Sequence, residues 1–288
     1  MINKPTIAIS RCLSGDRVRY DGREKKHAYV NNTLSKYFQL ISICPEVEIG
    51  LSVPRPPMHL VRKNQSLHAV GVQDASKDFT GRLIQHAESL LPRLSSIDAY
   101  IFKARSPSCG VYSTPVDAED ALSSGIFANH VMRLIPDLPV IDEPLLDDVN
   151  LRDQFLEATY CYSAWRQMSL DALANKKQNM IETYGMRWSL RTGLSLQYLD
   201  NVEAEEFQTV FFQGLKTYLP LDQRVRRISE SLRSNAIKVN AELDRRLNNI
   251  SSETNCVQSN LVALLSSLEQ QNALKMSADE SDLRLANG

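Results

Sequence analysis

The feature that most constrains the fold is the alternation of short apolar strands with helical segments over the first half of the chain. The strand-like runs are residues 6–10, 38–43, 99–103 and 138–141, and the helical patterns are residues 27–37, 77–91 and 118–134. A proline- and glycine-rich loop, residues 47–71, interrupts this alternation. Strands that alternate with helices build βαβ units, in which the strands run parallel. We therefore predict an α/β fold with a Rossmann-like, mainly parallel sheet for residues 1–147.

The second half of the chain has few strand signals and long helical stretches. We predict an all-α C-terminal region, with a helical domain at 148–222, a long helix at 223–276 and a disordered tail at 277–288. From Leu243 onward, apolar residues alternate at spacings of four and three residues. This heptad pattern is typical of a coiled-coil seam or of a long helix packed on its own domain, and the first alternative predicts a homodimer.

Three of the five cysteines follow predicted strands. Cys12, Cys44 and Cys109 come after the first, second and third strands, whereas Cys161 and Cys256 fall within helical stretches. The carboxyl ends of parallel strands share one edge of a sheet, where α/β proteins bind ligands, so the three thiols are expected to converge there. Thiolates that meet repel one another unless a cation neutralises them, and thiolate ligands suit zinc or iron–sulfur clusters. The alternative is that these cysteines are small apolar residues of the core.

Polar residues adjoin the three cysteines and are expected to line the same crevice. Glu46 follows the second cysteine by two positions, and Ser106 and Ser108 precede the third. Arg55 lies in a proline-rich loop, where it is either a wall of the site or a solvated surface residue. Asp21 follows the first cysteine and is either a substrate contact or part of an ordinary turn.

Three segments around these cysteines resemble the bacterial thiouracil desulfidase family. The segments are CLSGDRVRYDG at 12–22, CPEVEIGLSVPRPP at 44–57 and SPSCG at 106–110. The resemblance spans roughly residues 4–145. It implies a [4Fe–4S] cluster that is held by Cys12, Cys44 and Cys109 and leaves one iron open for the substrate.

The resemblance also implies roles for the polar residues. A glutamate after the second cysteine and a serine before the third are active-site groups in that family, and they match Glu46 and Ser106. We expect Glu46 to act as the general base and Ser106 to orient the substrate or water. Ser108 ranks second for the serine role, and Ser108, Arg55 and Asp21 are predicted to bind the substrate.

The implied activity is that of a desulfidase. It would remove sulfur as sulfide from a thiolated pyrimidine or a related small thiocarbonyl compound and replace it with oxygen from water. Two departures from the family pattern leave the substrate open: Ser14 replaces a usual leucine, and residues 74–80 read DASKDFT where many members have an Asp-Val-Thr element. Residues 151–167 look like the junction to the helical partner domain of two-domain relatives.

Composition points to a cytoplasmic protein without a membrane partner. The net charge is −1, and no apolar run approaches the roughly 20 residues that span a bilayer. The arginine-rich stretch 224–246 could contact RNA phosphates, but acidic residues interrupt it, which favours a solvated helix face. A desulfidase that acts on thiolated nucleosides in RNA is therefore one alternative. A non-enzymatic module that binds a metal or cluster is another.

Overall fold

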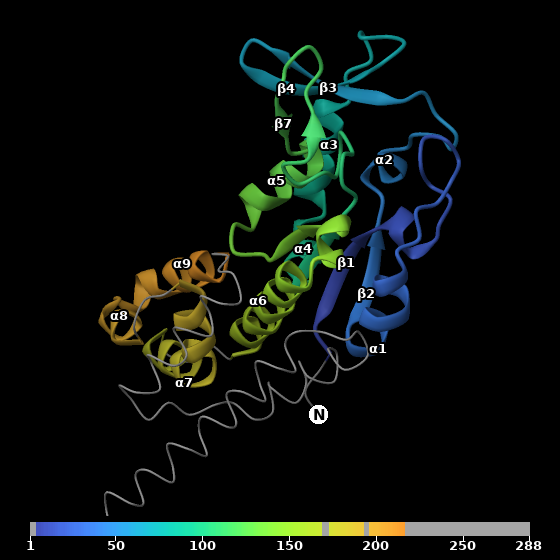
Figure 1. Cartoon of the computed structure of the whole chain (residues 1–288). Helices are drawn as coiled ribbons and strands as arrows, with labels where there is room; N and C mark the ends of the chain where they lie inside the picture. Colours follow the sequence, from blue (N-terminus) through green and yellow to red (C-terminus); the bar gives the residue numbers. More distant parts are fainter. Residues whose placement is uncertain (1–3, 169–172, 193–195, 217–288) are drawn as a thin grey trace, which may run out of the picture. The chain divides into compact units, whose positions relative to one another are not determined.

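A computed structural model describes residues 4–168, 173–192 and 196–216 (Figure 1). The chain divides into two compact units, Met1–Phe155 and Leu156–Gly288. The predicted heptad, the arginine-rich stretch and the predicted tail lie outside the described residues. The division falls eight residues beyond the predicted boundary at 147/148, within helix α6 (Val149–Gln167).

A four-stranded parallel sheet forms the centre of the first unit. Its spatial order is β2-β1-β5-β8, with bounds Gln39–Ile43 for β2, Thr6–Ser10 for β1, Ala99–Phe102 for β5 and Val140–Asp142 for β8. Ala8 of β1 pairs with Ile41 on one side and with Tyr100 on the other. Every residue of β5 is buried, as expected for a strand covered on both faces. The predicted α/β fold with a mainly parallel sheet is confirmed.

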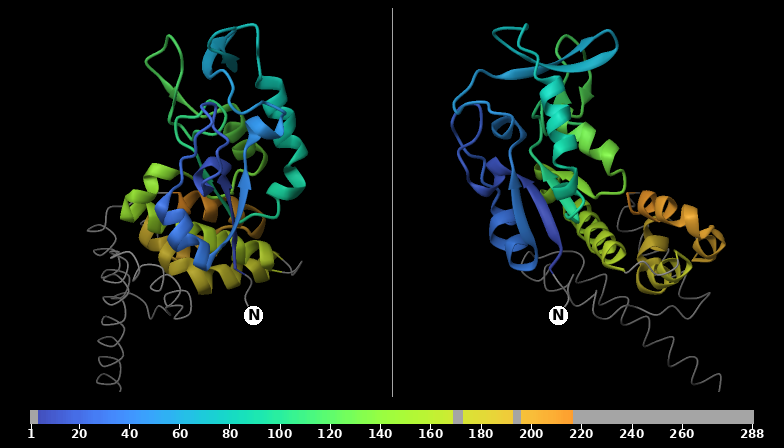
Figure 2. Two further views of the ribbon diagram at one scale, coloured as in Figure 1. Left: turned by 90° about the vertical axis from the view of Figure 1, so that its right-hand side faces the viewer. Right: turned by 180° about the vertical axis from the view of Figure 1, so that it is seen from behind.

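Helices cover both faces of this sheet. A π-helical turn at Val30–Leu34 leads into α1 (Ser35–Tyr37), and Figure 2 shows α1 and α3 (Thr80–Ser89) on opposite sides of the sheet. Helix α5 (Ile126–Leu134) packs beside α3 and places Phe127 edge-on to Tyr100 and Phe102 of β5, at centroid distances of 6.4 and 6.5 Å. Four short helices directly follow longer elements. They are η1 (Arg11–Ser14) after β1, α2 (Pro45–Glu48) after β2, α4 (Leu91–Leu94) after α3 and η3 (Glu143–Asp147) after β8.

The predicted loop at 47–71 is wrong in its second half. Residues from Met58 form a hairpin of β3 (Met58–Lys63) and β4 (Ser66–Gly71). Asn64 and Gln65 join the strands with φ values of 48° and 67°, the positive angles of a primed two-residue turn. The prolines at the start of the segment obscured this strand pattern.

The predicted helix at 118–134 is also too long. Its first half instead belongs to a small hairpin of β6 (Thr114–Pro115) and β7 (Leu122–Ser123), and the helix begins only after Gly125. A Cβ atom at Gly125 would lie 2.5 Å from the carbonyl carbon of Ser108, so only glycine allows this close approach of two backbones.

The described elements of the second unit are helices. Helix α6 (Val149–Gln167) begins in the first unit and is followed by α7 (Leu173–Thr192), α8 (Leu196–Asn201) and α9 (Ala204–Leu215). Aromatic side chains form its core: Trp188 donates a 2.9 Å hydrogen bond from Nε1 to the carbonyl of Phe211, and Trp165 packs 6.1 Å from Phe207. Within the described ranges, no helix is long and apolar enough to cross a membrane.

Candidate active site

A cavity of about 340 Å³ opens at the carboxyl edge of the sheet, within the first unit. Its walls come from the segments after β1, β2 and β5 and from the two hairpins. The volume lies within the range of small-molecule binding sites. Of the predicted site residues, Cys12, Cys44, Cys109, Glu46, Arg55 and Ser106 line this cavity.

The structure brings the three cysteine thiols to this one cavity. Burial raises the pKa of Cys12 to about 12, and the nearby Cys44 contributes to the rise. Burial likewise raises the pKa of Cys44, and it raises that of Cys109 well above the ordinary thiol value, again with a contribution from Cys44. Three buried thiols that suppress one another's ionisation are suited to a cationic group, which would ionise them. Across the described ranges, no three His, Cys, Asp or Glu side chains are grouped as ligands of a single metal ion.

The loop that carries Cys109 is tied down by local hydrogen bonds. Ser106 Oγ accepts from the backbone N–H groups of Ser108 and Cys109, at 3.3 and 3.1 Å. The N-terminal N–H groups of α5 also point at this loop, because Ile126 and Ala128 donate to the carbonyls of Pro107 and Ser108 at 2.9 and 3.0 Å. The loop therefore satisfies helix donors that otherwise lack partners.

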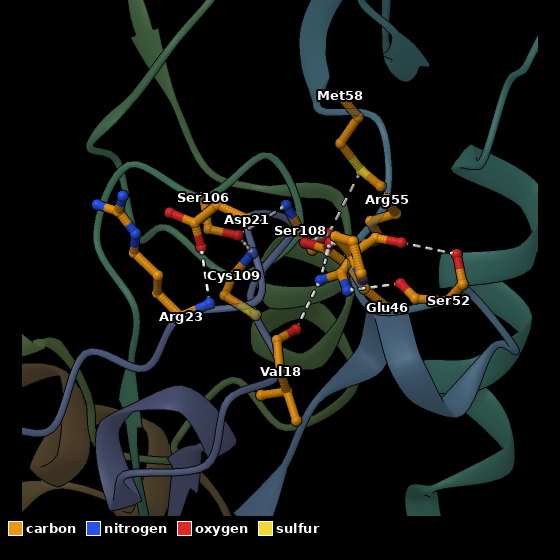
Figure 3. Close-up of polar contacts among 11 residues, drawn as sticks. Val18, Asp21, Arg23, Glu46, Ser52, Arg55, Met58, Ser106, Ser108 and Cys109 are labelled. Atoms are coloured by element: carbon orange, nitrogen blue, oxygen red, sulfur yellow. Dashed lines mark hydrogen bonds and ion pairs between the residues drawn. The ribbon is translucent and has the colours of Figure 1, made fainter.

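Glu46 is held at both carboxylate oxygens (Figure 3). Arg55 Nε donates to Oε2 at 2.7 Å, and Nη2 lies 2.6 Å from the same oxygen in an ion pair. Ser108 Oγ donates to Oε1 at 2.9 Å. The guanidinium also donates to the carbonyls of Val18 and Ser52, at 3.0 and 3.2 Å. The Arg55 side chain is only 6% exposed, so it forms a buried wall of the cavity and not a solvated surface group.

The two candidate serines occupy different positions. Ser106 lines the cavity, and its hydroxyl organises the turn before Cys109. Ser108 is fully buried and contacts Glu46. Asp21 does not line the cavity: its carboxylate accepts from the backbone N–H of Arg23 at 3.1 Å and lies 3.6 Å from Arg19 Nη1.

A lysine–glutamate pair lies at the end of β5, and the sequence did not predict that these two residues meet. Lys103 lines the cavity, and its ammonium donates to Glu143 Oε1 and to the carbonyl of Ala104. Glu143 is buried, and its second oxygen accepts from the backbone N–H of Ala104. The positive charge of Lys103 lowers the pKa of Cys12, against the larger effect of burial. The only local signal was the position of Lys103 at the end of a strand.

His59, on β3, also lines the cavity. Its position in a predicted loop hid its place on β3. Its Nδ1 lies 3.2 Å from Asp117 Oδ2, which belongs to the loop after β6. Only the pairing of two hairpins distant in sequence brings these residues together.

Asp142, at the end of β8, binds the segment that follows Cys109. Its carboxylate accepts from the backbone N–H of Val111 at 2.9 Å and from the hydroxyl of Ser113. Burial raises the pKa of Asp142 to about 6, although these hydrogen bonds act in the opposite direction.

We predict that Asp142 makes stability dependent on pH. Because the folded pKa is above the unfolded value, the folded state binds the proton more tightly, and this contribution is lost as pH rises from about 4 through 6. Asp142→Asn removes the charge at constant size. Thermal unfolding at pH 5 and pH 7.5 should show the wild type losing more stability than the variant at the higher pH. Parallel changes in the two proteins would contradict the assignment.

Comparisons with known proteins identify relatives of the first unit. Residues 7–143 match the model of the 2-thiouracil desulfurase family. A solved structure, that of the [4Fe-4S]-dependent thiouracil desulfidase TudS, shares 29% sequence identity with the chain; the match covers 52% of this chain and 97% of that one, with a TM-score of 0.42. The search of curated proteins found no match.

Proposed function

Because residues 7–143 match the model of the 2-thiouracil desulfurase family, we propose that this protein is an iron–sulfur-dependent desulfidase. It converts the thiocarbonyl group of a thiolated pyrimidine or a related small compound to a carbonyl, consuming water and releasing sulfide. The observation that carries the proposal is the cavity in which three buried thiols lie with an arginine-paired glutamate.

The proposed cofactor is a [4Fe–4S] cluster, held by Cys12, Cys44 and Cys109. The donor set supports it, because three buried thiols of raised pKa need a cationic partner in order to ionise, and iron–sulfur clusters are bound by cysteine thiolates. When bound through three thiolates, the cluster supplies an iron with an open position, a Lewis acid that can bind the thiocarbonyl sulfur. Lys103 adds a positive charge beside this group of negative ligands.

Glu46 is the proposed general base. It would take a proton from the water that attacks the thiocarbonyl carbon, and Arg55 and Ser108 hold its carboxylate in place for that task. Both oxygens keep lone pairs for water, since a carboxylate has about four acceptor sites. Ser106, at the cavity wall, would orient the substrate or water by hydrogen bonding.

The cavity walls support a small substrate. Val18, Ile43, Pro57 and Met58 contribute apolar surface, and the positively charged and polar groups are placed among them. Such a lining suits a flat heterocycle with a few polar atoms. The nucleic-acid alternative depends on residues 224–246, which lie outside the described residues.

Anaerobic reconstitution followed by a sulfide-release assay tests the proposal. We expect full-length protein treated with iron and sulfide to become brown and to release sulfide from 2-thiouracil, 4-thiouracil or a thiouridine, with the oxygenated pyrimidine as the second product. Protein without reconstitution is the control and should be inactive. A colourless protein that binds one equivalent of zinc and releases no sulfide would contradict the proposal and favour the non-enzymatic module.

A further inference from the structure

The two hairpins form one connected structure that supplies part of the cavity lining. A parallel bridge joins Leu60 of β3 to Val116, and the backbone N–H of Asp117 donates to the carbonyl of Leu60 at 2.7 Å. Arg62 pairs with Glu119 at 2.8 Å on the same side. The hairpins lie together at one end of the first unit (Figure 1). The segment 114–119 is thus fixed against β3, and the geometry of both is set before a ligand arrives.

His59 is the titratable residue that this hairpin structure contributes to the cavity. Its side chain is 30% exposed, and its Nδ1 lies 3.2 Å from Asp117 Oδ2. In the neutral imidazole, a carboxylate at that nitrogen selects the tautomer in which Nδ1 carries the proton, because the carboxylate can only accept. The other ring nitrogen, Nε2, then has a lone pair and can accept a hydrogen bond.

Acceptors of this kind are scarce among the charged side chains of the cavity. Arginine and lysine only donate, and the lone pairs of Glu46 that Arg55 and Ser108 leave free are assigned to the attacking water. A thiolated pyrimidine, in contrast, has an N–H group next to its thiocarbonyl and needs an acceptor there. His59 has the chemistry to provide it.

We infer that His59 binds the substrate by accepting a hydrogen bond from a ring N–H of the thiolated pyrimidine, and that Asp117 is the positioning residue that holds its tautomer. The substrate class in this inference rests on the proposed function. The pair therefore acts on substrate binding and selectivity, whereas Glu46 acts on the chemical step.

The test compares His59→Ala with His68→Ala in the full-length protein. His68 is a matched control because it lies on the partner strand β4 and has the same kind of carboxylate pair, with Nδ1 2.7 Å from Asp78 Oδ2, but does not line the cavity. The probes are 2-thiouracil and its 1-methyl and 3-methyl derivatives. Calorimetry measures their Kd, and sulfide release gives KM and kcat.

We expect His59→Ala to weaken 2-thiouracil binding about tenfold and to raise KM with little change in kcat, while His68→Ala behaves as the wild type. Methylation of one ring nitrogen should weaken binding to the wild type by a similar factor, because it removes the donor. In His59→Ala the methylated and unmethylated compounds should bind alike. Asp117→Ala should raise KM by an intermediate factor, and Asp117→Asn should restore it, since an amide oxygen still accepts from Nδ1–H.

The outcomes separate this inference from the proposed function. Unchanged binding in His59→Ala, or an undiminished effect of N-methylation in that variant, overturns the role of His59 even if the wild type releases sulfide. Binding that depends on His59 without any sulfide release overturns the proposed reaction and leaves the contact standing. If the wild type binds none of the three pyrimidines, both are overturned.

Discussion

Cys109→Ala will lose its iron and its sulfide-release activity together. Cys109 is 5% exposed and lies in a loop held by Ser106 and by the N-terminus of α5. The loop therefore has little freedom to offer another ligand, and an alanine methyl group cannot bind iron. After anaerobic reconstitution we expect about four iron atoms per chain in the wild type and close to none in the variant. Iron analysis, the visible spectrum and sulfide release measure the effect.

Cys161→Ala is the matched control. Cys161 is also a buried cysteine, fully inaccessible within α6, but it does not line the cavity. Loss of a buried sulfur atom costs some stability in both variants, so thermal unfolding without iron separates this cost from the loss of a ligand. Cys109→Ala with a full complement of iron would show that the cluster is not held by this cysteine. Iron loss in Cys161→Ala alone would exclude the cavity as its site.

Glu46→Gln will keep the iron and lose the reaction. Glutamine has the size of glutamate and leaves all three thiols in place, but its amide is not a base. Proton transfer by a positioned base contributes roughly 10²- to 10⁴-fold to a rate, and we expect kcat to fall by about this factor. Iron content and the visible spectrum should match those of the wild type, while stopped or steady-state assays of sulfide release give kcat.

The change also leaves the buried Arg55 guanidinium without its ionised partner, which carries a cost in stability. Ser108→Ala provides the graded control, because it removes only the hydrogen bond to Oε1 and keeps the ion pair. We expect a smaller loss of kcat, about tenfold, in that variant. Wild-type kcat in Glu46→Gln would rule out Glu46 as the base. If Glu46→Gln unfolds below the assay temperature, Glu46→Asp is measured in its place. We expect a reduced kcat in that variant.

The parallel sheet was predictable because its strands are short apolar runs. A strand that is covered by helices on both faces of the sheet must be apolar along its length. β1, β2 and β5 agree with the predicted runs to within one residue at each end, and β8 within two. The two hairpins were not predictable from the sequence. Prolines precede β3, and the strands β6 and β7 are only two residues long. They are tied to each other by the bridge between Leu60 and Val116, a contact between segments far apart in the sequence.

The sequence by itself determined the fold class and the position of Cys12, Cys44 and Cys109 behind strands that share one edge. These features depend on local apolar patterns and on the direction of parallel strands, and both can be read along the chain. Only the tertiary structure decided which polar and charged side chains pair with one another around the cavity. Glu46 with Arg55, Lys103 with Glu143 and His59 with Asp117 are partners from different loops and strands. These groups pair because charged and polar side chains need partners when the elements that carry them are buried against each other. A local sequence pattern contains no information about such partners.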